Sequence, residues 1–135
     1  MGLNTRHNAI LIGAGNLGKA VATHIEFEKR GFSLSAVFDN NPALIGKQIG
    51  HLNVLDISTL EEVCSLAKPV VAVLCIPKEA ARNLADRLIA LGIKGFWNFS
   101  HYDLLHHSDD IVVENVHLSD SLMTLNYLVK NTEGK

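Results

Sequence analysis

Three glycines at positions 13, 15 and 18 constrain the fold of this chain more than any other feature of its sequence. They follow a short apolar run over residues 8–13, which is typical of a buried parallel strand. They also open a segment in which Leu17, Val21 and Ile25 recur at four-residue spacing, and this spacing predicts a helix that stops at Gly31. A strand, a G-x-G-x-x-G loop and a helix in this order form the phosphate-binding turn of dinucleotide-binding domains.

An acidic residue at the end of the next predicted strand completes the motif. Residues 33–39 alternate polar and apolar side chains before becoming apolar, and the turn-forming residues 40–42 end this strand. Asp39 stands about 20 residues beyond the last glycine of the loop, where such domains carry an acid. Its carboxylate can accept hydrogen bonds from the adenosine ribose hydroxyls, and its charge repels a 2′-phosphate. The motif therefore favours NAD(H) over NADP(H).

Each glycine of the loop has its own predicted role. Gly13 allows the tight turn after the strand, Gly15 lets the pyrophosphate approach the backbone, and Gly18 lets the helix pack against the sheet. The unpaired N–H groups and the dipole at the start of the helix then hold the pyrophosphate. The sequence thus predicts an adenine-dinucleotide site at this turn.

The rest of the chain continues the alternation of strands and helices. A capping-box sequence from Ser58 to Glu61 predicts the start of a helix that ends before Pro69. Pro77 predicts the start of another helix, with Gly92 as its stop. Further strands are predicted at residues 52–55, 70–76, 95–99 and 111–116.

Strands that alternate with helices of this length predict an α/β fold with a doubly wound parallel sheet, a Rossmann fold. We expect one dinucleotide-binding domain over residues 1–135. Its core is expected at residues 7–117 and a terminal helix at residues 118–130.

Composition and charge narrow the classes of function. Hydrophobic residues make up 47% and charged residues 19% of the chain, which is a globular composition. The formal net charge of −2 gives no basic surface for nucleic acid, and no apolar stretch approaches the ~20 residues of a membrane span. Cys64 and Cys75 are too far apart for a compact metal or redox motif and are predicted to be buried, reduced thiols. We expect a cytoplasmic protein.

Short segments along most of the chain resemble the nucleotide-binding domain of the Rex redox-sensing transcriptional repressors. The resemblance extends from about residue 7 to residue 131, and so many ordered segments are more specific than the glycines alone. CoA-binding Rossmann domains are more distant relatives. The segments are LIGAGNLG at 11–18, VFDNNP at 37–42, IGKQIG at 45–50, VLCIP at 73–77, AA at 80–81, ADRL at 85–88, GIKG at 92–95, NF at 98–99 and the closing residues 118–128.

The resemblance implies a non-enzymatic module that senses the NADH/NAD⁺ ratio. In Rex proteins, NADH binding at this domain closes a homodimer and removes its winged helices from DNA. No winged-helix segment precedes residue 7 here, and His117 stands where the family usually has an aspartate just before the last helix. We therefore expect no direct binding of nucleic acid or membrane, and any protein partner is unidentified.

The last predicted helix is expected to be exchanged between the two subunits of a homodimer, as in Rex relatives. A helix that is apolar over more than one face needs more than one packing partner. The two apolar stripes of this helix consist of Leu118, Leu122, Leu125 and Val129 on one side and Met123 and Tyr127 on another.

The predicted NAD(H) site combines the glycine loop, the acid and positions that the resemblance implies. Lys47 lies in a predicted loop, where it either neutralises a phosphate or is solvated. No catalytic and no metal-binding residue is expected. The predicted cofactor-binding residues are Gly13, Ala14, Gly15, Asn16, Leu17, Gly18, Asp39, Asn40, Lys47, Ile76, Pro77, Asn98, Phe99 and Ser100.

Two alternative functions remain open. His101 follows the segment that Rex proteins place at the nicotinamide end, and an imidazole there can act as the acid–base group of a small NAD(H)-dependent oxidoreductase. Hydride transfer needs water excluded, however, and no second domain is predicted to enclose a substrate.

The second alternative is a different ligand, because the glycine loop at residues 13–18 also suits CoA or another adenine nucleotide. His106 and His107 are adjacent and point apart, so with His101 and His117 they predict a polar region rather than a metal site.

Overall fold

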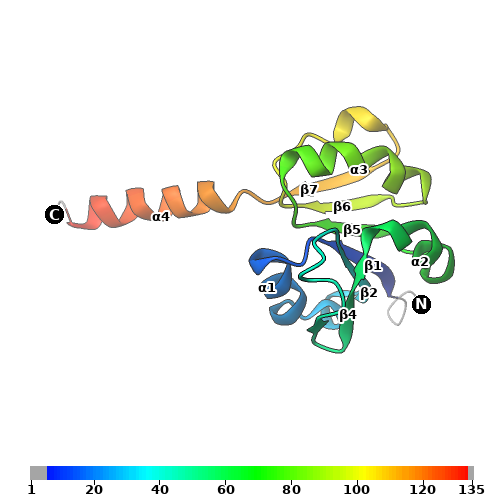
Figure 1. Ribbon diagram of the computed structural model, residues 1–135. Helices are drawn as coiled ribbons and strands as arrows, with labels where there is room; N and C mark the ends of the chain where they lie inside the picture. The colour runs from blue at the N-terminus through cyan, green and yellow to red at the C-terminus, as the bar shows by residue number, and fades with distance from the viewer. Residues whose placement is uncertain (1–5, 134–135) are drawn as a thin grey trace.

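A seven-stranded sheet organises the computed structural model, which describes residues 6–133 (Figure 1). Its strands are β1 (His7–Ile12), β2 (Phe32–Asp39), β3 (Gln48–Ile49), β4 (Leu52–Asp56), β5 (Val71–Leu74), β6 (Gly95–Asn98) and β7 (Val112–Asn115). They lie in the order β3-β4-β2-β1-β5-β6-β7, and only β3 and β4 pair antiparallel. The predicted α/β parallel sheet is confirmed, whereas β3 was not predicted.

The helices α1 (Asn16–His24), α2 (Leu60–Ala67) and α3 (Lys78–Ala90) cover the two faces of the sheet, because successive side chains of a strand point to opposite sides and both faces are apolar. The chain also contains α4 (Leu118–Glu133) and the short 3-10 turns η2 (Phe27–Arg30), η3 (Ile57–Thr59) and η4 (Leu105–His107). Ile10 and Ile12 of β1 pack with Leu60 of α2 and Leu88 of α3. Leu11 points the other way, into the core under α1.

The last helix leaves the sheet instead of packing on it. Figure 1 shows α4 extending from the end of β7 away from the other elements. Large apolar side chains are exposed along it, among them Leu122 (67%) and Tyr127 (65%). Within residues 6–133, no helix combines the length and the apolar character that crossing a membrane requires.

The first helix is shorter than its apolar spacing predicted. α1 ends at His24 because Ile25 adopts an extended conformation, and the turn η2 then leads to Gly31, which has a φ of 91°. This early turn lets Phe27 reach the sheet, where its ring meets the edge of Trp97. The prediction of one continuous helix up to Gly31 was therefore wrong.

The predicted capping box was also wrong. The segment Ile57–Thr59 is a 3-10 turn, and α2 begins only at Leu60. The carboxylate of Asp56, rather than a side chain at Ser58, caps this turn by accepting a hydrogen bond from the Ser58 amide at 3.0 Å. Glu61 does not reach back to the start of the helix but pairs with α3.

Candidate functional site

A cavity of about 520 Å³ opens at the carboxyl ends of β1, β2 and β5, where the strand order reverses. Ligands of open α/β sheets bind at this position. Of the predicted cofactor-binding residues, six line the cavity: Gly13, Gly15, Asp39, Asn40, Ile76 and Pro77. The lining residues that were not predicted to bind the cofactor are Ile12, Ile57, Cys75, Ala80, Asn83, Leu84 and Arg87.

The three glycines of the loop differ in the space around them. Gly13 has a φ of +105°, and a Cβ atom there would lie 2.3 Å from the carbonyl oxygen of Cys75. A Cβ atom at Gly18 would lie 1.6 Å from the carbonyl oxygen of Gly13. At Gly15, by contrast, a Cβ atom would meet nothing within 4 Å. Gly13 and Gly18 are thus required by the fold, whereas Gly15 leaves space open at the start of α1.

The carboxylate of Asp39 connects the end of β2 to the glycine loop. Its Oδ2 accepts a hydrogen bond from the Ala14 amide at 2.7 Å, and its Oδ1 accepts one from the Asn41 amide at 2.9 Å. A carboxylate has about four lone-pair sites. Asp39 therefore retains acceptor capacity for the hydroxyl groups of a ligand in the cavity that it lines.

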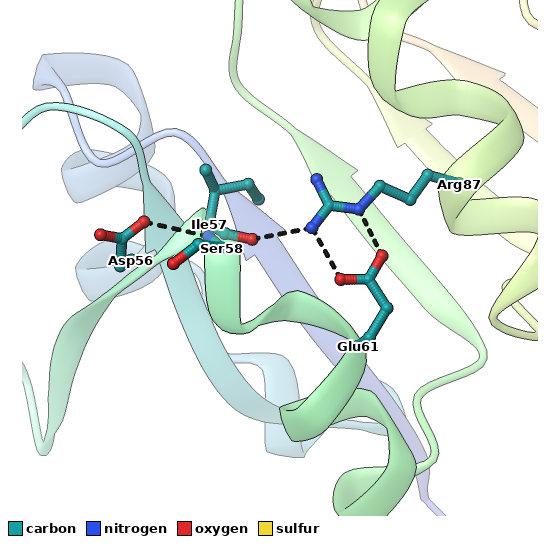
Figure 2. A network of polar contacts seen from close by, with 5 residues as sticks. All are labelled: Asp56, Ile57, Ser58, Glu61 and Arg87. Carbon is teal, nitrogen blue, oxygen red and sulfur yellow. Dashed lines mark hydrogen bonds and ion pairs between the residues drawn. The ribbon is translucent and has the colours of Figure 1, made fainter.

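Arg87 of α3 places the guanidinium of an ion pair at the edge of the cavity. Figure 2 shows this group between the carboxylate of Glu61 and the backbone carbonyl of Ile57. Its Nε and Nη2 donate to the two carboxylate oxygens, the second at 2.7 Å, and Nη2 also donates to Ile57 at 3.1 Å. The hydrogen bonds from Arg87 lower the pKa of Glu61 from 4.5 to about 2, so Glu61 is ionised at neutral pH.

The predicted residues at and after the end of β6 are not among those that line the cavity. Asn98 is 1% exposed, and its Oδ1 accepts hydrogen bonds from the amide and hydroxyl of Ser100 at 3.1 and 2.5 Å. Its Nδ2 donates to the Tyr102 carbonyl and to Asn115 of β7. Phe99 packs against Trp97, with ring centroids 4.9 Å apart. In the described chain these side chains therefore stabilise the end of the sheet. Their role in cofactor binding stays a prediction.

Other predicted residues support the loop or lie outside the cavity lining. Ala14 and Leu17 pack into the core under α1, and Asn16 is the first, exposed residue of that helix. Lys47 has an exposed side chain, and its backbone bonds to Leu44 and Val54 hold the turn before β3. The structure thus gives Lys47 a backbone role, and its proposed contact with a phosphate is untested.

The two cysteines differ in their surroundings. Cys64 is buried in the core, as predicted, but Cys75 lies just beyond β5 and is only partly buried, so that prediction was wrong for one of the two. Both thiols are free. Burial raises the pKa of the Cys75 thiol to about 12. The cavity is therefore lined by a neutral thiol at physiological pH.

The histidines near the end of the chain lie in separate places and contact polar or aromatic neighbours. The Nδ1 atoms of His101 and His117 lie 3.1 Å apart, beside the start of α4. The ring of His107 bridges Tyr102 and Asp86, at 2.6 Å on each side. Within residues 6–133, no three metal-ligating side chains gather into a group that suits a metal ion. His101 is not among the residues that line the cavity.

Comparison with known proteins first defines the class of this domain. The family described as CoA binding domain matches residues 4–102. The chain therefore belongs to the CoA binding domain family.

Within this class, the particular proteins that the chain resembles are redox-sensing transcriptional repressors named Rex. It is 49% identical to Rex of Thermoanaerobacter sp. (strain X514), over 98% of this chain and 59% of that one. It is 47% identical to Rex of Clostridioides difficile (strain 630), over 100% of this chain and 63% of that one. The chain thus spans about three fifths of the length of these relatives, and the resemblance predicted from the sequence is confirmed.

Solved structures give the same result for the fold. A crystal structure of RSP, a Rex-family repressor, in complex with β-NADH matches with a TM-score of 0.86 and 48% identity, over 98% of this chain and 63% of that one. A structure of RSP with β-NAD⁺ and operator DNA matches with a TM-score of 0.84 at the same identity, over 98% of this chain and 60% of that one. The predicted Rossmann-like fold is confirmed, whereas exchange of α4 between subunits is not shown.

Proposed function

We propose that this chain is a non-enzymatic NAD(H)-binding module that senses the redox state of the nicotinamide pool. The proposal rests on one observation: Gly15, whose backbone faces open space, and the carboxylate of Asp39 line the same cavity. The first gives a pyrophosphate access to the N–H groups at the start of α1, and the second gives ribose hydroxyls an acceptor. The similarity to RSP, whose structures hold β-NADH and β-NAD⁺, supports this proposal.

Calorimetric titration of the chain with NADH, NAD⁺ and CoA tests the proposed ligand. We expect saturable binding of one NADH per chain, and a change in affinity between NADH and NAD⁺. CoA should neither bind tightly nor displace NADH. Failure of a folded sample to bind either dinucleotide would refute the proposal, and displacement by CoA would favour the CoA-binding alternative.

We further propose that the chain does not turn over its cofactor. His101, the candidate acid–base residue, lies outside the cavity lining, and its ring contacts His117 at the start of α4. The similarity to a protein named as a redox-sensing transcriptional repressor, rather than as an enzyme, supports the same proposal. Incubation of NADH with the chain and a panel of small carbonyl compounds should leave the absorbance of NADH unchanged, and steady oxidation would contradict the proposal.

We also propose that the chain forms a homodimer through α4, with the helices exchanged between subunits. Besides Leu122 and Tyr127, the side chains of Leu125, Leu128 and Val129 are exposed on this helix. Exposed apolar patches of this kind mark interaction sites.

The same molecule offers a surface that such a helix fits. A mainly apolar groove of about 390 Å³ crosses the sheet face beside α1, and its walls include Ile25, Phe32, Val71, Trp97 and Val112. We propose that α4 of a second copy occupies this groove, because burying both apolar surfaces together removes them from water.

We propose finally that these 135 residues do not bind DNA directly. Their net charge of −2 offers little release of counterions, which drives most association with DNA. Fluorescence anisotropy with duplex DNA at low salt should show no saturable binding. Sequence-dependent binding at submicromolar concentration would show that the sensor region itself contacts DNA.

A further inference from the structure

The candidate cavity contains one acid and one base among its lining residues in the described chain, Asp39 and Arg87. The basic residue, Arg87, already has hydrogen-bond partners in the protein. Arg87 donates from Nε and Nη2 to both oxygens of Glu61, and from Nη2 to the carbonyl of Ile57 (Figure 2). Glu61 projects from α2, whose inner side is anchored in the core by Leu60 and Cys64. The carboxylate is therefore presented to Arg87 from a fixed element.

This geometry matters because of what a free arginine does near an adenosine ribose. In dinucleotide-binding domains, an acid at the end of the second strand selects the free 2′-hydroxyl, whereas a nearby arginine accommodates a 2′-phosphate. The guanidinium fork binds carboxylate and phosphate with the same two-bonded geometry. A carboxylate that occupies the fork therefore competes directly with a phosphate.

We infer that Glu61 is a specificity-determining residue that withholds Arg87 from phosphate and so excludes adenine nucleotides with a second phosphate on the ribose. Such ligands carry the phosphate at the 2′ position, as NADPH does, or at the 3′ position, as CoA does. The inference rests on the proposed binding of NAD(H) in this cavity. It adds to Asp39 a second determinant, which comes from α2 rather than from the glycine motif.

The charges of the cavity support the inference. Glu61 balances the charge of Arg87, so an incoming ribose phosphate meets the unbalanced anion Asp39 and gains no net attraction. In the part of the chain that the structure describes, the Nη1 group of Arg87 has no hydrogen-bond partner. Nη1 can therefore still donate to a neutral base or hydroxyl. The ion pair of Glu61 and Arg87 thus offers a ligand hydrogen-bond donors but no net positive charge.

Small ligands isolate the adenosine end of the site. The full chain is titrated calorimetrically with 5′-AMP, adenosine 2′,5′-bisphosphate and adenosine 3′,5′-bisphosphate, and with NADH and NADPH. Glu61→Gln removes the charge that balances Arg87 and one of the two acceptors that occupy its fork. We therefore expect at least one bisphosphate to gain about tenfold in affinity relative to 5′-AMP. NADPH should gain relative to NADH if the 2′ position is the one recognised, and adenosine 3′,5′-bisphosphate should gain if the 3′ position is.

Two further variants make the result specific. Glu62→Gln removes the same charge from the neighbouring position of α2 without touching Arg87, and it should leave every affinity ratio unchanged. The double variant Glu61→Gln with Arg87→Ala should lose the gain. Glu61→Ala is a second way to release Arg87, and thermal melts establish that each variant is folded.

Three outcomes would overturn the inference. First, Glu61→Gln and Glu61→Ala could leave every affinity ratio unchanged, as Glu62→Gln should. Second, they could weaken the binding of all ligands in equal proportion, as loss of a purely structural ion pair would. Third, their gain in affinity for a bisphosphate could persist when Arg87 is also replaced by alanine. In each of these cases NADH still binds the unmodified chain, so the proposed function stands. If the unmodified chain binds neither NADH nor 5′-AMP, the proposed function fails and this inference falls with it.

Discussion

The amide of Ala14 donates a 2.7 Å hydrogen bond to Oδ2 of Asp39, so the glycine loop is tied directly to the end of the neighbouring strand. The other oxygen of this carboxylate holds the Asn41 amide at the turn that follows. Asp39, which lines the cavity, therefore holds the backbone both at the glycine loop and at the turn after β2. A side chain known from sequence motifs as a ligand contact is here also part of the scaffold.

Substitution of Asp39 should alter cofactor choice. Hydrogen bonds to a charged group contribute about 1.5–3 kcal/mol, so the unmodified chain should prefer NADH to NADPH by roughly ten- to a hundredfold. Asp39→Ala should weaken NADH and leave NADPH unchanged or slightly tighter, measured by calorimetry. Asp39→Asn serves as the control for structure, because its amide oxygen still accepts one backbone hydrogen bond while the charge is gone. An unchanged ratio in both variants would assign Asp39 to the scaffold alone.

Alanine substitutions should separate the three glycines of the loop. Gly13→Ala and Gly18→Ala place a Cβ atom against backbone oxygens, and we expect each to lower the free energy of unfolding by about 2 kcal/mol or more. Gly15→Ala meets open space at a φ of −72°, so the protein should keep its stability and lose affinity for NADH. Urea unfolding and cofactor titration measure the two properties. Tight NADH binding by Gly15→Ala would place the pyrophosphate elsewhere.

Charged substitutions on α4 should disrupt the proposed dimer. Leu122→Glu and Leu125→Glu place an anion on the apolar surface of the helix, so light scattering should show monomers. Asn126→Asp adds charge at an exposed polar position of the same helix and is the matched control. A dimer that persists in both leucine variants would locate the interface on another surface.

The contribution of Glu61 to stability should depend on pH. Its pKa is lower in the folded chain, about 2 against 4.5, so the stabilisation is complete above about pH 4.5 and is lost as the pH falls toward 2. Glu61→Gln should therefore be less stable than the unmodified chain at pH 7, and the difference should shrink between pH 4.5 and 2 in urea unfolding. Added salt should shrink it too. A difference that is constant over this range would mean that the ion pair does not stabilise the fold.

The local parts of the site were predictable from the sequence because their physics is local. The turn at Gly13 and the close packing at Gly18 follow from a strand that turns into a helix over a few residues. The position of Asp39 follows from the length of one strand–helix–strand unit. These features have fixed spacing, so a single sequence is enough to identify them.

The contacts between distant elements were not predictable in this way. Glu61 and the segment before it have the pattern of a capping box. The carboxylate of Glu61 instead accepts hydrogen bonds from Arg87, which lies on α3, far away in the sequence. Asn98 ends strand β6 and Ser100 follows it, as ligand-binding residues often do, yet their polar atoms bond to one another, to the Tyr102 carbonyl and to Asn115 of β7. In both cases the partner is set by the packing of the sheet and its helices, which residue spacing does not encode.

The pair of Glu61 and Arg87 also has a mechanical consequence. It joins α2, which follows β4, to α3, which follows β5, and these two strands lie on opposite sides of β1. The contact therefore spans the crevice between the two halves of the sheet and limits how far they separate. Both side chains are partly exposed, at 35% and 51%, so dissolved ions weaken this brace. We expect the crevice to open more often as the ionic strength rises, so that a ligand associates and dissociates faster.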